Sequence, residues 1–412
     1  MTPQADEIAS LVLEEFGKLP PKRRPAVRDN GLHEWVPLSG IVVKGPNMLK
    51  CVALATGMKC LPASKLPEAN GVVIHDWHAE VLAIRSFNRF LLDECHRLAQ
   101  GASAESDILS RQSSSSASPP FLWRPELSLH MYCSEAPCGD ASMELTISAQ
   151  TDPTPWELPS PSPSPSPQLL GRGHFSSLGI VRRKPARGDA PPTASKSCSD
   201  KIALKQCTSL LSSLTSLLIS PAENVYLTSL ILPESQYSET GCIRCFGISD
   251  TAGAGGGRMN SLKGKRWDTP KTGYAVVPFA VETTSKEFEY SKRSVAARSP
   301  PKKTAAASNL AVAWTVDGRV DEGLIGGVLQ GRKAFTLKGA SAVSRRSMWA
   351  LAKEIAQRLG DEELVEGLSA ETYDQVKEGK LLQGRRRVKE EVRRDALKGW
   401  LRNTGDETFS LR

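Results

Sequence analysis

The chain has 412 residues, of which 40% are hydrophobic and 24% are charged, proportions that are typical of a soluble globular protein. No run of about 18 apolar residues occurs, so we expect no membrane-spanning helix, and the acidic first 20 residues lack the basic-then-apolar layout of a signal peptide. The net charge of +8 and the nine cysteines favour an anionic partner such as nucleic acid, and an intracellular protein whose reduced thiols are available for metal binding.

Hydrophobic periodicity predicts alternating helices and strands along most of the chain. Residues 1–20 and 78–98 have apolar side chains at helical spacing, and 41–58 alternates like two strands joined by a turn at 45–47. We expect further strands at 127–133, 225–232 and 310–316, and further helices at 137–149, 196–212, 344–359, 370–379 and 383–398.

Three stretches have the composition of disordered insertions. They are the serine-rich 101–120, the Pro-Ser tract 152–168 and the basic 291–308. We interpret the third as a basic linker, with a nuclear-localisation signal or an RNA-contacting loop as alternatives.

The segment His75-Asp76-Trp77-His78-Ala79-Glu80 opens the helix predicted at 78–98. A histidine and a glutamate two residues apart can project from the first helical turn into one cavity. Zinc hydrolases use such a pair, because the imidazole binds the metal while the carboxylate moves protons. H-x-E followed later by Pro137-Cys138 is the signature of zinc nucleobase deaminases. Pro137 is also expected to start a helix, whose dipole would favour the thiolate of Cys138.

A catalytic zinc ion takes three protein ligands, and the spacing leaves the third one open. In the compact signature a second cysteine follows the first by three residues, but Ala141 stands there. The candidates are Cys133, Cys198, Cys242 and Cys245. Cys198 has the polar setting that suits a ligand best, whereas we interpret Cys133 as a core residue and the C-x-x-C pair as structural.

Five blocks, in this order, resemble the family of adenosine deaminases acting on RNA, and within it the fungal deaminases that are specific for tRNA. They are Thr56-Gly57-Met58-Lys59-Cys60, His75-Asp76-Trp77-His78-Ala79-Glu80, Ser134-Glu135-Ala136-Pro137-Cys138-Gly139-Asp140-Ala141-Ser142, Arg183-Lys184-Pro185-Ala186-Arg187-Gly188-Asp189 and Ser197-Cys198-Ser199-Asp200-Lys201. The segment 226–234 and the end of the chain, with Trp400 and Phe409-Ser410-Leu411, also fit. The resemblance covers nearly the whole chain, so we expect residues 1–412 to form a single adenosine deaminase (A to I editase) domain.

The resemblance implies a three-layer, cytidine-deaminase-like α/β fold, with a mixed central sheet flanked by helices and an extended C-terminal helical part. It implies zinc bound by His78, Cys138 and Cys198, and Glu80 as the catalytic proton shuttle. Asp76 would belong to a polar relay, and Lys59 would lie near the RNA.

The resemblance also implies a buried inositol hexakisphosphate. Its expected ligands are Arg85, Lys201, Arg345 (or Arg346), Tyr373, Lys377 and Trp400. The sequence departs from the longer RNA-editing relatives at Leu204, Lys205, Arg402 and Asn403. The full contact list of the inositol phosphate therefore stays open.

The implied function is hydrolytic deamination of adenosine to inosine in tRNA, at the position 3′ of the anticodon of tRNA-Ala. An anticodon loop already splays its bases, which reduces the energy needed to flip one. We expect no membrane association and no obligate protein partner, and a location in the nucleus, the cytoplasm or both. The alternatives are a deaminase acting on another RNA, an inactive RNA-binding partner subunit, and a protein with a structural zinc.

Overall fold

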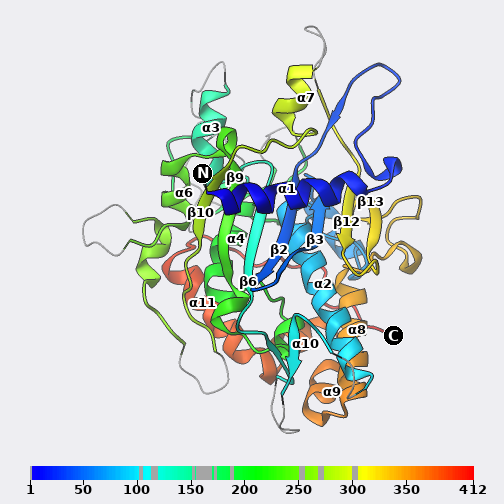
Figure 1. The fold of residues 1–412 in the computed structure, drawn as a ribbon. Coiled ribbons are helices and arrows are strands. Elements are labelled where there is room, and N and C mark those ends of the chain that lie inside the picture. The colour runs from blue at the N-terminus through cyan, green and yellow to red at the C-terminus, as the bar shows by residue number, and fades with distance from the viewer. Residues whose placement is uncertain are drawn as a thin grey trace.

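A mixed β-sheet runs through the middle of the molecule (Figure 1). The computed structural model describes residues 2–101, 105–112, 119–150, 154, 169–170, 174–185, 190–249, 256–267, 273–298 and 305–412. Within this part the sheet has eight strands in the order β10-β9-β6-β2-β3-β12-β13-β14. They are β2 (Leu38–Gly45), β3 (Met48–Thr56), β6 (Ser128–Cys133), β9 (Leu227–Pro233), β10 (Ala280–Thr284), β12 (Ala311–Thr315), β13 (Asp321–Ile325) and β14 (Val328–Leu329). Strand β9 is parallel to both β10 and β6, and the other neighbours are antiparallel.

The long helix α1 (Pro3–Lys18) covers one face of this sheet (Figure 1). Its start is capped, because the Thr2 side chain accepts the Ala5 N–H at 3.2 Å and proline suits the first helical position. Its apolar stripe packs on the strand side chains that face it, such as Val42. At Gly40 a Cβ atom would lie only 2.5 Å from Val12, so the glycine allows the helix to approach the sheet closely.

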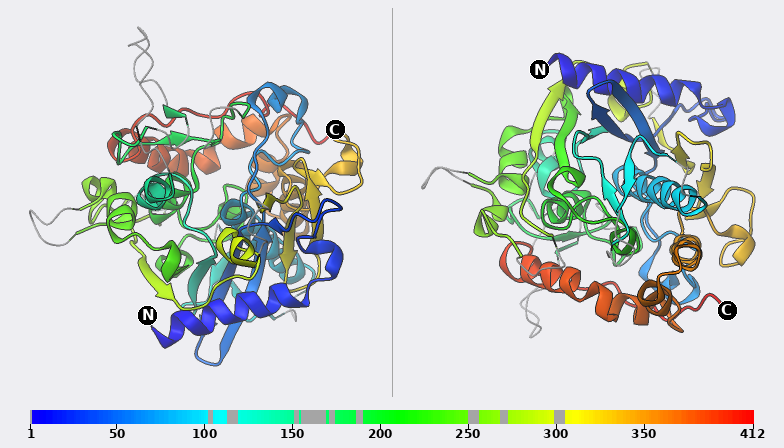
Figure 2. Two further views of the ribbon diagram at one scale, coloured as in Figure 1. Left: turned by 90° about the horizontal axis from the view of Figure 1, so that it is seen from above. Right: turned by 60° about the horizontal axis from the view of Figure 1, so that its bottom comes forward.

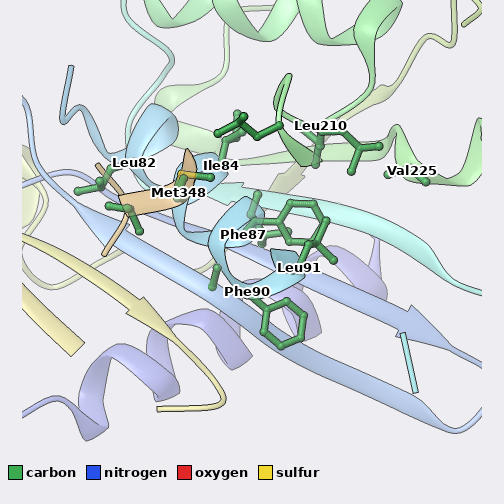
Figure 3. Close-up of a cluster of buried hydrophobic side chains, with 14 of the residues drawn as sticks. Leu82, Ile84, Phe87, Phe90, Leu91, Leu210, Val225 and Met348 are labelled. Atoms are coloured by element: carbon green, nitrogen blue, oxygen red, sulfur yellow. The ribbon is translucent and has the colours of Figure 1, made fainter. Parts of the chain in front are cut away.

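The opposite face of the sheet carries the larger helical layer. Helix α2 (Ala79–Ala99) packs on β2 and β3, and Figure 3 shows Phe87 and Leu91 of this helix within the buried cluster. Figure 2 shows α11 (Gln383–Asp395) on the side of the sheet opposite α1. The other helices are α3 (Met143–Ser148), α4 (Cys198–Thr208), α5 (Thr215–Leu218), α6 (Glu239–Phe246), α7 (Lys292–Arg298), α8 (Arg345–Leu359), α9 (Glu362–Leu368) and α10 (Tyr373–Glu378).

The predicted three-layer α/β architecture is therefore confirmed, as is the extended C-terminal helical part formed by α8 to α11. Short two-stranded pairs stand outside the main sheet: β1 (Glu34–Trp35) with β11 (Ala306–Ala307), β4 (Leu109–Arg111) with β5 (Phe121–Trp123), and β7 (Leu169–Leu170) with β8 (Arg182–Arg183). No helix in the described ranges is both long enough and apolar enough to cross a bilayer.

One predicted helix begins later than expected, and two of the expected insertions contain regular structure. The helix expected from Pro137 begins only with the 3-10 turn η3 (Asp140–Ser142), because Gly139 has a φ of 108° that no helix accommodates. The insertion expected at 291–308 contains α7 and β11, since Ser291 caps α7 and Val295 anchors it by burial. The insertion expected at 101–120 likewise contains β4, whereas 152–168 lies outside the described residues except for Thr154.

Candidate metal centre and anion cavity

Two helix starts and one loop meet at one end of the sheet. His78 occupies the N-cap position of α2, and its own N–H donates to the Asp76 carboxylate at 3.1 Å. Cys198 is the first residue of α4, directly after Ser197, whose side chain accepts the Asp200 N–H at 3.1 Å. Cys138 lies in the loop that follows β6. The fold thus brings together three residues that are separated by 60 positions at each step.

Gly139 makes this convergence possible. A Cβ atom at Gly139 would collide with the side chain of Ser197, so only glycine lets the Cys138 loop reach the start of α4. Backbone hydrogen bonds then fix the approach: the Ser199 N–H donates to the Cys138 carbonyl at 3.0 Å, and the Cys198 N–H points to the Cys138 sulfur at 3.4 Å.

The ligand atoms of His78, Cys138 and Cys198 all lie within 4.8 Å of one another. The Cys138 Sγ and His78 Nδ1 atoms are 3.8 Å apart. Tetrahedral zinc, with Zn–N near 2.0 Å and Zn–S near 2.3 Å, separates its ligand atoms by about 3.5–3.8 Å. The donor set and its spacing therefore fit a zinc ion with one coordination position left for a small molecule.

A second group, Cys60 with Asp76 and His78, also has its atoms within 4.8 Å. The Asp76 carboxylate is already engaged by two lysines, as described below. The two-cysteine group is consequently the better candidate for a metal.

Glu80 is buried one residue after the start of α2, on the same turn as His78. Burial, followed by the nearby charge of Cys138, raises the pKa of Glu80. A carboxyl group whose pKa is raised in this way can hold a proton and release it close to the three ligand atoms. This is the property that a proton carrier needs.

Asp76 is the centre of a buried polar network. Lys184 donates to both carboxylate oxygens, at 3.0 and 2.8 Å, and the Ser195 hydroxyl donates at 2.6 Å. Lys201 contacts the same carboxylate from α4. Burial alone would raise the pKa of Asp76, but the two ammonium groups hold it well below its usual range. Lys184 also donates to the Cys198 sulfur at 3.2 Å, which connects the network to the candidate metal centre.

Lys201 also faces two adjoining cavities of about 310 and 340 Å³. Every residue that we predicted for inositol phosphate lines at least one of them: Arg85, Lys201, Arg345, Tyr373, Lys377 and Trp400. Cations outnumber carboxylates by nine to four among the described residues around the first cavity, and no carboxylate is found among those around the second.

Several cavity residues were missed in the sequence. Arg385, Lys389 and Arg393 recur every four residues along α11, so they share one face of that helix, and this spacing was the available signal. Further cations around the cavities are Lys196, Lys205, Arg386 and Arg402. The sequence could not show that α11 turns this face inward.

Several cavity cations have no carboxylate partner among the described residues. Lys205 donates to the carbonyls of Leu210 and Leu211, and no partner of Lys389 is found in the described part of the chain. Burial and then the charge of Arg385 lower the pKa of Lys205 well below its usual range. Burial together with Lys377 does the same to Lys389. Such a concentration of cations is unfavourable unless an anion joins it.

The remaining predicted positions fall as follows. Lys59 is exposed beside Asn309, and its carbonyl accepts the Trp77 N–H at 3.0 Å, which places it next to the segment that carries His78. Cys133 is buried in β6, while Cys242 and Cys245 are buried on α6, apart from the three-residue group. Residues 186–189 of the fourth sequence block lie outside the described residues.

Comparison with known proteins adds independent information. Residues 53–404 match the adenosine-deaminase (editase) domain family. The chain is 36% identical over 407 residues to "tRNA-specific adenosine deaminase 1" of Schizosaccharomyces pombe, covering 97% of this chain and 95% of the relative. It is 34% identical over 238 residues to the protein of the same name from Saccharomyces cerevisiae, covering 55% and 58%. A more distant match, 28% identical over 252 residues, is "Double-stranded RNA-specific editase Adar" of Drosophila melanogaster, with 57% and 34% covered.

Proposed function

This chain belongs to the adenosine-deaminase (editase) domain family, and we propose that it converts adenosine to inosine in tRNA with the help of a zinc ion held by His78, Cys138 and Cys198. The observation that carries the proposal is the convergence of these three residues beside the buried carboxyl group of Glu80. Membership of the family makes the chain an adenosine deaminase, and the metal, substrate and residue roles are our inference.

Bound zinc supplies a Lewis acid that makes a water molecule acidic at neutral pH. The remaining chemistry belongs to the protein. Glu80 accepts a proton beside the ligand group and returns it to the departing amine, a task for which its raised pKa is suited. Lys184 holds the Cys198 sulfur in place and is itself balanced by Asp76.

The proposed substrate is a tRNA, at the adenosine 3′ of the anticodon of tRNA-Ala. Two of the relatives reported above are named as specific for tRNA, and one of them matches the chain almost from end to end. Lys59 is exposed next to the segment that bears His78, where it can meet an RNA phosphate. With a tRNA substrate, we propose a location in the nucleus, the cytoplasm or both.

We propose inositol hexakisphosphate as the occupant of the cationic cavities. A compact polyphosphate suits them, because the cations converge from α4, α8, α10 and α11 onto a space of a few hundred Å³. Cations such as Arg85 and Arg385 donate to neutral carbonyl groups, so their charge is not balanced by those contacts. Lys201 would link the ligand to Asp76 and so to the metal centre.

The test is to incubate the purified chain with an unmodified tRNA-Ala transcript and to sequence the cDNA for adenosine read as guanosine. The Glu80→Gln variant runs in parallel, with zinc measured in both proteins. We expect conversion only at the adenosine next to the anticodon, reduced by about 10²–10⁴-fold in the variant, and equal zinc. A zinc-loaded chain that leaves this transcript unchanged but deaminates another RNA would overturn the substrate assignment. A chain that binds no zinc would overturn the metal centre.

A further inference from the structure

A segment far along the chain reaches back to the residues that carry the metal-binding histidine. Residues 405–412, which we call the strap, lie between the start of α8, the start of α10 and the loop at Gly71. The backbone carbonyls of Glu407 and Phe409 accept the N–H groups of Asp374 and Tyr373, at 2.8 and 3.0 Å. These N–H groups open α10 and have no partner within their own helix, so the strap is held by the helix start.

Asp406 is the contact point between the strap and the metal-binding segment. Its side chain is only 1% exposed, and it accepts hydrogen bonds from the Gly71 N–H at 2.7 Å and from His75 Nε2 at 2.6 Å. Arg345, which lines the anion cavity, donates to the Asp406 carbonyl at 3.0 Å. Arg345 Nη1 also lies 3.5 Å from the Asp406 carboxylate, so the carboxylate is contacted both by the segment and by the cavity wall.

His75 begins the short path to the metal centre. Its carbonyl accepts the Leu61 N–H at 2.9 Å, and three residues later His78 starts α2. Burial and the charge of Arg345 lower the pKa of His75 to about 4, so the neutral ring donates its Nε2–H to Asp406. The other ring nitrogen, Nδ1, is buried and has no partner in the described ranges. The hydrogen bond to Asp406 is therefore the one that this ring makes in the described ranges.

We propose that His75 and Asp406 are positioning residues for deamination: the strap holds the segment 71–78 so that His78 lies against Cys138 and Cys198. The inference rests on the proposed zinc site and deepens it. The ring of Phe409 contributes to the same task, because it stacks on Tyr373 with centroids 5.0 Å apart and lies directly on Gly71. The segment is therefore held at Gly71 and at His75.

The experiment compares His75→Leu, which removes the donor, with His75→Gln, whose amide can still donate to Asp406. The matched control is His96→Leu, because His96 forms a similar pair with Glu354 at 3.0 Å between α2 and α8, far along α2 from His78. Two quantities are measured for each protein: the affinity for zinc alone, by competition with a chelator, and kcat and KM on the tRNA transcript at saturating zinc.

We expect His75→Leu to bind zinc about 10-fold more weakly and to lose a similar factor in kcat. This is the lower end of the effects of direct hydrogen-bond partners of metal ligands, because His75 acts on His78 only through the backbone between them. KM for tRNA should change less than twofold, His75→Gln should recover most of both losses, and His96→Leu should match the parent. Equal zinc affinity and kcat in His75→Leu and His96→Leu would overturn the proposal, as would a glutamine variant no better than leucine. If the parent itself does not deaminate tRNA, the substrate assignment fails, and the zinc affinities alone decide the role of His75.

Discussion

Replacing Asp76 by asparagine tests the buried network beside the candidate metal centre. The change keeps the shape of the side chain but removes the negative charge that Lys184 and Lys201 share. Lys184 is only 4% exposed and Asp76 only 5%, so solvent cannot take the place of the lost partner. Asp76→Asn should therefore destabilise the fold and weaken zinc binding, because Lys184 also contacts the Cys198 sulfur.

The magnitude follows from burial. Removing one partner of a buried ion pair typically costs 3–5 kcal/mol, and the amide oxygen of asparagine retains part of the hydrogen bonding. We expect the free energy of unfolding at pH 7 to fall by about 3 kcal/mol. The folded-state pKa of Asp76 is depressed, so this contribution is present above the unfolded value of about 3.9 and is lost as pH falls towards the folded value. The variant should lose that part of the acid dependence.

The assay is urea unfolding of parent and variant from pH 3 to pH 8, with zinc content measured in parallel. Asp395→Asn is the control, because Asp395 pairs with Arg394 at the surface, where solvent screens the pair and its contribution to stability is small. A variant at Asp76 that unfolds at the same urea concentration as the control would refute the reasoning. It would mean either that water solvates the ammonium group of Lys184 in place of the carboxylate, or that Lys184 is neutral.

Three further predictions concern separate parts of the molecule. Cys198→Ala should reduce bound zinc, measured by mass spectrometry, from about one ion per chain to near zero, whereas the control Cys242→Ala should retain the ion. Zinc retained in Cys198→Ala would exclude Cys198 as a ligand. Burial, Arg385 and Arg345 lower the pKa of Lys377 to about 7, so without an anion its charge opposes folding, and stability rises with pH from about 7 towards 10.4. Lys377→Met should then stabilise the ligand-free chain at pH 7 by about 2 kcal/mol, allowing for partial exposure, and weaken inositol hexakisphosphate binding in calorimetry; a variant that is less stable without ligand would contradict this. Val12→Ala should cost about 2 kcal/mol in thermal unfolding with zinc content unchanged, and a loss of zinc would show that α1 does more than cover the sheet.

Local features of the sequence determined much of the architecture. Apolar side chains with a period of two or of about four residues predicted the strands β2, β3 and β6 and the helices α1, α2 and α8, because a half-buried element imposes its own repeat on the chain. The spacing of His78 and Glu80 likewise placed both on one helical turn. The departures were also local: the backbone at Gly139 delays η3 past Pro137, and α7 forms in a stretch whose composition favoured disorder.

Hydrophobic periodicity could not predict contacts between residues that lie far apart in the sequence. Spacing left four cysteines open as the third member of the ligand group. The polar setting of Cys198 favoured it, the family resemblance implied it, and the tertiary structure placed it beside Cys138. The four-residue spacing of Arg385 and Lys389 indicated that α11 has a charged face but not that this face turns inward. The pairing of His75 with Asp406, 331 residues apart, had no local signal. Whether a charged face turns inward depends on which groups the rest of the chain places opposite it. The repeat of a helix shows that the helix has a charged face, but only the tertiary structure determines which residues that face contacts.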